Sequence, residues 1–370
     1  MKELRELVSD LSMLHGISSR EDDVADYMRK AFSPFSNDIK TDILGNVICH
    51  ISCGRESAKK LLVFAHSDEL GMIIHKIENN GFLRATRVGG VSVNVLPGTK
   101  MDIIGKKGIR KGIVGITSHH VTPPEEKGRL PALNRLYIDA GFTSKEQAEQ
   151  AGITVGCFCT YSAEKPIMLG EELICGKAMD NRACCAGLIA YAHEVCQLQK
   201  QNLLEWDIYI VACVQEELNV RGILPVVTAI QPDASIGLDI AVAADTPDLT
   251  GSSDITLGGG PCITYFNFHG RGTLAGVLPD KALLECLENV CEKNAILFQR
   301  EVIIGIITEN AFISFHNQGI PVANISIACR YTHTPVETVH LGDLSAIVGL
   351  LTAFTKELVF TQAFGKNNFV

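Results

Sequence analysis

Hydrophobic residues near the start of the chain recur at the spacing of amphipathic helices. Within residues 2–15, leucine and valine return at steps of three and four residues, which predicts a helix with one apolar face. The same spacing resumes over residues 21–32, after two serines. We therefore expect a second helix there, capped by Ser18 or Ser19.

Short apolar runs then replace the helical pattern. Residues 42–48 place a Gly-Asn pair between short apolar stretches, which predicts a hairpin. Residues 60–66, KLLVFAH, are almost continuously apolar. A run of this length is typical of a strand that is covered on both faces of a sheet.

The pattern changes again after about residue 70. Residues 72–165 are rich in Gly, Val and Ile in short alternating stretches, broken by Gly-Gly, Pro-Gly and Pro-Pro pairs. This indicates a small β-barrel or sandwich. One helix is expected within it, over residues 144–151, with Ser144 as its cap and Gln147 three residues later.

From about residue 166 strands and helices alternate. Strands are expected at 207–214, 234–240, 301–307 and 321–328, and helices after Asp180, near 281–298 and near 343–357. The chain is therefore predicted to adopt an α/β fold, with a mostly parallel, doubly wound sheet and helices on both faces. Residues 1–70 and 166–370 would form the two parts of this domain, and residues 71–165 a β domain inserted between them.

Composition narrows the class of protein. The formal net charge of −9 and the pI near 5.7 argue against a nucleic-acid partner. No apolar run reaches the roughly 18–20 residues of a membrane span, and the charged N-terminus does not resemble a secretory signal. Thirteen cysteines, many in apolar runs and without paired CxxC spacings, are expected to be reduced. We expect a cytoplasmic enzyme without a membrane partner.

Histidine and acidic side chains follow the predicted strands, at the point where each strand ends. Because ligands bind at the carboxyl ends of strands in open α/β sheets, these side chains are expected to meet in one site. Imidazoles and carboxylates without thiolates suit zinc, cobalt or manganese. The set exceeds the needs of one ion, so we expect two divalent metal ions per subunit with one bridging carboxylate. The candidates are His66, Asp68, Asp180, Glu216, Glu217, Asp239 and His333.

The spacing within this set suggests a division of labour. Asp68 lies two residues after His66, as expected of a carboxylate that orients a metal-bound imidazole. The adjacent pair Glu216-Glu217 would let one carboxylate bind metal while its neighbour takes a proton from water. The remaining histidines show no spacing that assigns them a role.

These motifs resemble those of the tetrahedral aminopeptidases, a family of clan MH metallopeptidases. The family is also called the glutamyl or deblocking aminopeptidases, and some of its members are labelled endoglucanase-like. The resemblance extends over essentially the whole chain. It rests on AHSDELG at 65–71, GKAMDNR at 176–182, VQEELNVRG at 214–222, Asp239 with ADTP at 244–247, GGGP at 258–261, RYTHTP at 330–335 and, within the insert, IDAGFTSKEQAE at 138–149.

The resemblance implies a role for each matching residue. His66 and Asp239 would hold one metal ion, Glu217 and His333 the other, and Asp180 would bridge them.

It also assigns the proton transfer and the assembly. Glu216 would be the general base and later the acid for the leaving amine, while Asp68 would orient His66. In this family the insert is a dimerisation domain, and dimers assemble into hollow tetrahedral dodecamers that release N-terminal residues from short peptides.

The chain departs from the family pattern in three places, one of which is Cys184-Cys185 in place of residues that are commonly small and apolar. Most members carry Thr-Asp-Ala where this chain has Thr308-Glu309-Asn310-Ala311, beside the expected site, which affects the expected substrate preference. A glycine is usual before Arg221, where this chain has Leu-Asn-Val.

Three other functions fit parts of the pattern. The same metal site would serve an N-acyl amino acid or dipeptide hydrolase. A glycosidase would use Glu216 or Asp180 in a carboxylate pair, but would leave His66 and His333 without a role. A non-catalytic binding protein would not need the complete set of ligands and base.

Overall fold

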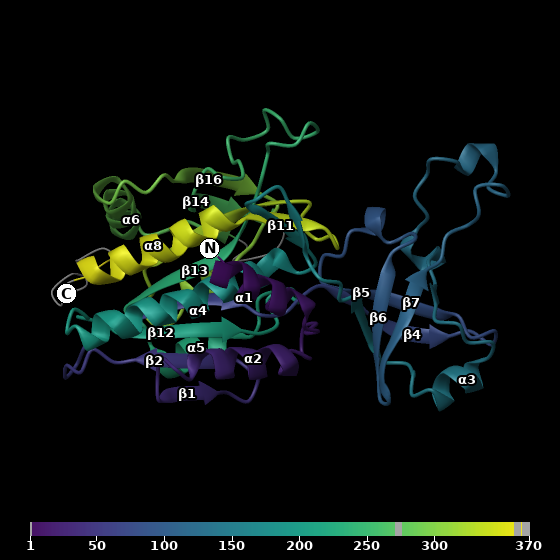
Figure 1. The fold of residues 1–370 in the computed structure, drawn as a ribbon, viewed down its shortest axis with the longest axis horizontal. Helices are drawn as coiled ribbons and strands as arrows, with labels where there is room; N and C mark the ends of the chain where they lie inside the picture. Colours follow the sequence, from purple (N-terminus) through teal and green to yellow (C-terminus); the bar gives the residue numbers. More distant parts are fainter. Residues whose placement is uncertain (1, 271–275, 359–363, 365–370) are drawn as a thin grey trace.

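The computed structural model describes residues 2–270, 276–358 and 364 of the 370-residue chain. It consists of an α/β domain and a smaller β-barrel that projects from it, as Figure 1 shows. The α/β fold with an inserted barrel confirms the fold class predicted from the sequence.

Within the described residues, twelve strands form one mixed sheet. Its main path runs through β1 (Asp38–Thr41), β2 (Val47–Ile51), β12 (Asp207–Cys213), β3 (Lys60–His66), β13 (Ala234–Val242), β17 (Val322–Arg330), β18 (Glu337–His340), β11 (Leu173–Gly176) and β10 (Ile167–Leu169). The four neighbours β12, β3, β13 and β17 are parallel. Antiparallel hairpins extend this parallel centre on both sides.

Three further strands branch from β17. They are β14 (Cys262–Phe268), β15 (Gly276–Val277) and β16 (Gln299–Ile304). β14 pairs antiparallel with β17 and parallel with β16.

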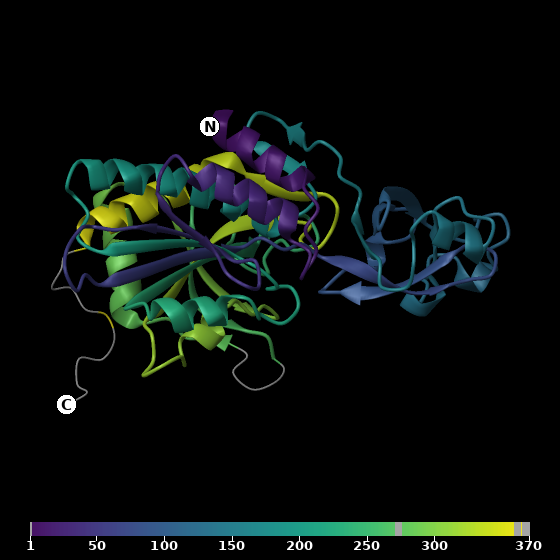
Figure 2. The same cartoon turned by 90° about the horizontal axis from the view of Figure 1, so that it is seen from below.

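Helices cover both faces of the sheet, as the views in Figures 1 and 2 agree. One face carries α1 (Lys2–Met13), α2 (Asp22–Phe32), α4 (Met179–Lys200) and α8 (Leu341–Glu357), and α6 (Lys281–Lys293) packs against α8. The opposite face carries α5 (Ile223–Ile230) and α7 (Asn310–Ile313). None of the described helices is long and apolar enough to cross a membrane.

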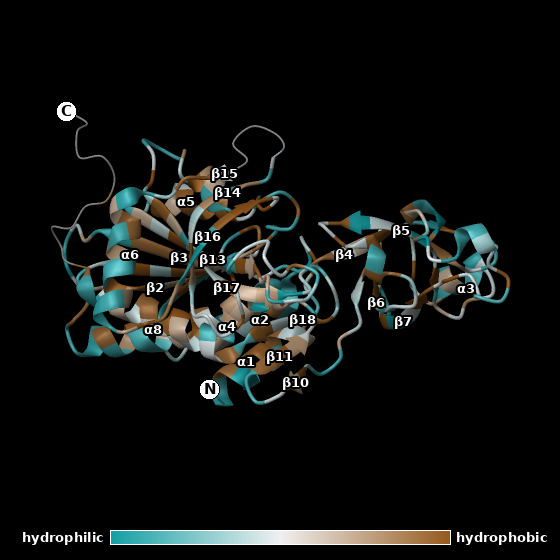
Figure 3. Ribbon diagram, turned by 90° about the horizontal axis from the view of Figure 1, so that it is seen from above, coloured by the Kyte–Doolittle hydropathy of each residue, from teal (hydrophilic) through white to brown (hydrophobic). Residues whose placement is uncertain are grey.

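The position of β3 in the sheet explains why its sequence is almost continuously apolar. Leu61, Val63 and Ala65 pack into the core beneath α4, whereas Leu62 and Phe64 pack into the core beneath α5. Because successive side chains of a strand point to opposite faces, a strand covered on both faces needs both sets to be apolar. Figure 3 shows this concentration of apolar residues along the central strands.

The inserted barrel is closed by six strands and has its own apolar core. In spatial order they are β4 (Gly71–Ile77), β5 (Leu83–Val88), β8 (Ile138–Asp139), β7 (Gly108–Val114), β6 (Lys100–Gly105) and β9 (Phe158–Tyr161). The helix expected near residue 144 is α3 (Lys145–Gln150), and the Ser144 hydroxyl accepts the predicted hydrogen bond from the Gln147 amide.

Some local predictions were wrong. Neither Ser18 nor Ser19 caps α2; Glu21 occupies the N-cap position and makes no side-chain cap, while the Ser18 hydroxyl donates to Asp68. The strand expected at 301–307 is β16, which ends at Ile304, and the helix expected to reach residue 298 ends at Lys293.

All thirteen cysteines fall in the described part of the chain, and each is a free thiol. All except Cys53 and Cys286 are buried. They act there as small apolar side chains.

Candidate metal centre

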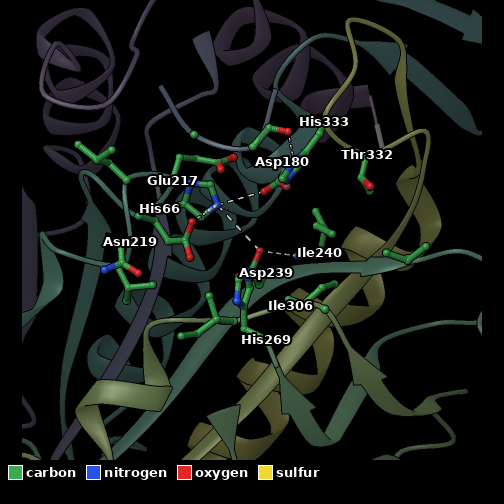
Figure 4. A pocket seen from close by; sticks show the side chains of 18 residues that line it. His66, Asp180, Glu217, Asn219, Asp239, Ile240, His269, Ile306, Thr332 and His333 are labelled. Atoms are coloured by element: carbon green, nitrogen blue, oxygen red, sulfur yellow. Dashed lines mark hydrogen bonds and ion pairs between the residues drawn. The ribbon is translucent and has the colours of Figure 1, made fainter. Parts of the chain in front are cut away.

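A cleft of about 520 Å³ opens at the carboxyl ends of the parallel strands. His66 is the last residue of β3, Glu216 and Glu217 follow β12, Asp239 lies in β13 and His333 follows β17. Asp180 enters the cleft from the start of α4. Six of the seven candidates line this cleft, and five of these are labelled in Figure 4; Asp68 is buried and does not line it.

Asp180 lies between the two imidazoles. Its Oδ1 atom is 3.1 Å from Nε2 of His66, and its Oδ2 atom is 3.5 Å from Nε2 of His333. Each imidazole turns its other nitrogen to a backbone carbonyl: Nδ1 of His66 is 3.3 Å from the Asp68 oxygen, and Nδ1 of His333 is 3.0 Å from the Gly90 oxygen. A tautomer that donates from Nδ1 leaves the Nε2 lone pair facing the cleft, as in metal-binding histidines.

The potential ligand atoms fall into two groups that share Asp180. His66, Asp180 and Asp239 each offer an atom within 4.8 Å of the others, and so do Asp180, Glu217 and His333. His66 also forms such a group with Glu216 and Glu217. The arrangement has the donor types and the shared carboxylate that two adjacent divalent ions require.

Asp68 contacts the loop after β12 in addition to His66, the one contact that the sequence predicted. Its carboxylate is 3.5 Å from Nδ1 of His66, but its shorter contacts are with the loop after β12. Oδ1 accepts from the amide of Glu216 at 2.9 Å, and Oδ2 accepts from the amide of Glu217 at 3.1 Å. The Ser18 hydroxyl completes this set at 2.6 Å. Asp68 therefore fixes the backbone that carries both glutamates.

The barrel holds His333 in place, which the sequence did not indicate. The carbonyl of Gly90, after β5, faces the His333 ring, and the hydroxyl of Tyr161, at the end of β9, donates to the His333 carbonyl at 3.3 Å. From the α/β domain, Glu337 accepts from the His333 amide at 2.6 Å. The Gly-Gly pair at 89–90 was visible in the sequence only as a strand break.

The cluster brings several carboxylates close together in a buried space, and a cation would relieve their mutual repulsion. Burial, with repulsion from neighbouring carboxylates, raises the pKa values of Glu216, Glu217 and Asp239 well above their usual range. The Oε1 atom of Glu217 is buried and has no hydrogen-bond partner among the described residues. An unpartnered buried oxygen within a set of carboxylates and imidazoles fits a metal ion.

Glu309 extends the acidic cluster behind Glu216. It is 2% exposed, accepts from the Cys213 thiol at 3.0 Å and forms a fourth group of potential ligand atoms with Glu216 and Asp239. The sequence marked this residue as a departure near the site, but gave no contact for it. His269, which received no role from its spacing, lies at the rim of the same cleft.

The fold and the site together define a hydrolase class: an α/β metallopeptidase with its catalytic groups at the ends of parallel strands. Comparison with known proteins identifies the family. The family model described as M42 glutamyl aminopeptidase matches residues 45–350, so the chain belongs to that family. It is a metal-dependent aminopeptidase by fold, site and relationship.

Individual relatives agree with this assignment. The chain is 39% identical over 350 residues to SgcX of Escherichia coli (strain K12), which is assigned as an aminopeptidase; the match spans 95% of this chain and 92% of SgcX. The aminopeptidase APDkam598 from the archaeon Desulfurococcus kamchatkensis superposes with a TM-score of 0.89 at 31% identity, over 97% of this chain and 96% of that one. The TET1 peptidase of Pyrococcus horikoshii, which can assemble into a tetrahedron or a large octahedral shell, superposes with a TM-score of 0.83 at 26% identity, over 96% and 100%.

Proposed function

We propose that this chain hydrolyses N-terminal residues from short peptides with two divalent metal ions in the cleft. His66 and Asp239 would hold one ion, Glu217 and His333 the other, with Asp180 shared between them. The observation that carries the proposal is the position of Asp180, which has the Nε2 atom of a different histidine at each carboxylate oxygen.

When bound, the ions would polarise the scissile carbonyl and increase the acidity of water. The residue that moves the proton is Glu216, whose carboxylate lies in the cleft, 3.9 Å from Nε2 of His66. Burial raises its pKa, so it is a stronger base than an exposed glutamate. Glu216 would take a proton from the attacking water and return it to the leaving amine. Asp68 holds Glu216 in position through the backbone amide.

The acidic lining also supports exopeptidase action. A peptide presents a positively charged α-amine only at its N-terminus, and the carboxylates of the cleft attract that charge. An internal peptide bond brings no such group. We therefore propose that the free amine is required for binding.

We also propose that the enzyme works as a homo-oligomer, with residues 71–165 as a dimerisation domain and a tetrahedral dodecamer as the final assembly. The barrel exposes large apolar side chains that a monomer would leave in water: Ile109, Ile113, Ile116, Val121 and Leu130 are each more than half exposed. The chain as a whole has the fold of the TET1 peptidase, which can assemble into a tetrahedron or a large octahedral shell. The free cysteines support a reducing, cytoplasmic location.

Zinc, cobalt and manganese all accept this donor set. The test is to reconstitute the purified protein with each metal, measure metal per chain, and assay aminoacyl anilides beside N-acylated amino acids. We expect two ions per chain and hydrolysis of aminoacyl anilides only. Turnover of N-acylated amino acids alone would identify the related N-acyl hydrolase, and glycoside hydrolysis that survives chelation would identify a glycosidase.

A further inference from the structure

One side of the cleft is apolar. Figure 4 shows Ile240 and Ile306 beside Asp239, on the opposite side of the site from Glu217 and Asn219. Val242, at the end of β13, and Ile307 continue the same lining. Ile306 and Ile307 follow β16 and are half-buried, so they present apolar surface to the cleft while packing against the core. Ile240, Val242, Ile306 and Ile307 are called the isoleucine wall below.

The charges of the cleft are confined to the metal cluster. Every acidic residue that lines the cleft belongs to the proposed ligands or is Glu216. Among the described lining residues there is no lysine or arginine, and the polar side chains near the isoleucine wall are Thr332 and His269. Among the described lining residues outside the metal cluster, the isoleucine wall therefore has no carboxylate, lysine or arginine to pair with a charged substrate side chain.

We propose that the isoleucine wall receives the side chain of the substrate's N-terminal residue, and that the enzyme prefers uncharged aliphatic residues such as Leu, Ile and Met. This inference rests on the proposed aminopeptidase function and specifies its substrate class. The α-amine and scissile carbonyl lie at the carboxylates and imidazoles, so the first side chain falls on the surface beside them. Ile240 is adjacent in sequence to Asp239, which ties the isoleucine wall to the reacting groups.

Physical chemistry sets the expected size of the preference. An aliphatic side chain gains from leaving water, whereas a charged one loses hydration and finds no counter-charge on the isoleucine wall. A single methylene more or less in a hydrophobic pocket changes kcat/KM by roughly 10- to 200-fold. We expect Leu, Ile and Met substrates to exceed Glu, Asp, Lys and Arg substrates by at least about tenfold.

The direct test is a panel of aminoacyl p-nitroanilides assayed with the metal-loaded enzyme. The best substrates are expected among Leu, Ile and Met. A Glu or Lys anilide as the best substrate would overturn the inference and leave the aminopeptidase proposal intact. If only N-acylated amino acids are cleaved, the aminopeptidase proposal fails, and the same ranking among N-acetyl amino acids still tests the isoleucine wall.

Two variants test whether the isoleucine wall determines the preference for aliphatic N-terminal residues. Ile306→Asp places a carboxylate on the isoleucine wall and should raise the ratio of Lys to Leu turnover by about tenfold or more. The matched control is Ile304→Asp, two residues earlier in β16, where the side chain is 75% exposed and does not line the cleft. The control should leave the ratio unchanged.

A milder substitution tests the same assignment if the Ile306→Asp variant fails to fold. Val242→Thr keeps the shape of the side chain but replaces one methyl group with a hydroxyl, and should lower kcat/KM for the Leu substrate several-fold relative to the Ala substrate. Binding of free leucine and free glutamate, followed by calorimetry, gives a second readout. Equal Leu-to-Ala ratios in Val242→Thr and wild type, or tighter binding of glutamate than of leucine, would contradict the assignment.

Discussion

The Nε2 atom of His66 lies 3.1 Å from Oδ1 of Asp180, and both side chains are buried. The second oxygen of the same carboxylate faces His333. Asp180 therefore connects two histidines from distant parts of the chain, one at the end of β3 and one in the turn after β17. In the proposed two-ion site, this carboxylate would be the ligand that both ions share.

Replacing Asp180 by asparagine tests this connection. Asp180→Asn keeps the shape of the side chain but removes the charge that the two ions would share. We expect metal content to fall below two ions per chain and kcat/KM to fall by at least about 100-fold. The control is Asp245→Asn, which breaks the pair with Arg330 outside the cleft. Two retained ions in Asp180→Asn would show that another residue bridges them.

Substitution of Glu216 distinguishes proton transfer from metal binding. Glu216→Gln removes the base but leaves the five proposed ligands in place, so we expect kcat to fall by about 10²–10⁴-fold. Metal content, measured by elemental analysis, should remain at the wild-type value. Full activity in this variant would mean that a different residue accepts the proton.

Metal affinity should rise with pH. Burial and neighbouring carboxylates raise the pKa values of Glu217 and Asp239. Hydrogen bonding to Asp180 and nearby carboxylates outweigh burial and raise the pKa of His333 to about 10. These groups therefore retain protons to higher pH than usual in the metal-free protein, and a cation has to displace those protons. We therefore expect weaker binding at pH 6 than at pH 8, with proton release in calorimetry. The same affinity and no proton release at both pH values would contradict this.

The contact between Gly90 and His333 predicts that the barrel affects the metal centre. A Cβ atom on Gly90 would lie 2.7 Å from Nδ1 of His333, closer than non-bonded atoms approach. Gly90→Ala should displace the ring and lower both metal content and activity, the latter by about 10- to 100-fold. Gly349→Ala in α8 is the control, because a Cβ there meets no atom within 4 Å. Unchanged metal content in Gly90→Ala would show that the ring tolerates the shift.

A buried carboxyl outside the cleft predicts a pH-dependent stability. Burial raises the pKa of Glu301 to about 7, and its Oε1 atom has no hydrogen-bond partner among the described residues. The folded protein then binds this proton more tightly than the unfolded chain, so Glu301 lowers stability as pH rises from about 4.5 to 7. The Glu301→Gln variant has no titrating group at this position, so it lacks this pH dependence.

The measurement is urea unfolding at pH 5 and pH 8. The stability of Glu301→Gln relative to wild type should increase between these values, by up to about 3 kcal/mol. Glu292→Gln, on the exposed surface of α6, is the control and should show no such trend. A difference that is constant with pH would mean that Glu301 does not titrate in this range.

The positions of the central strands along the chain and the residues at their ends were largely predictable. Continuous apolar runs such as 60–66 mark buried parallel strands, and the carboxyl ends of such strands meet at one edge. That is why His66, Glu216, Glu217 and Asp239 were recognised before any contact was known. Their proximity in the structure follows from the sheet topology.

Contacts between distant segments were not predictable from local pattern. Ser18 has the side chain of a helix cap, but its hydroxyl bonds Asp68 across 50 residues. Gly90 and Tyr161 look like a strand break and a barrel residue, yet both contact His333, which lies far along the chain. Glu309 stood out only as a departure from a motif, and its contact with Cys213 depends on how β12 and α7 pack.

The sequence by itself determined the fold class, the inserted barrel and the chemical types gathered at the strand ends, because hydrophobic periodicity and the residues that follow each apolar run are local features of the sequence. Only the tertiary structure decided which carboxylate lies between the two histidines, that the barrel supports one of them, and which side of the cleft is apolar. These features depend on side chains that meet across long stretches of chain, and their positions are fixed only when the sheet, the helices and the barrel pack together.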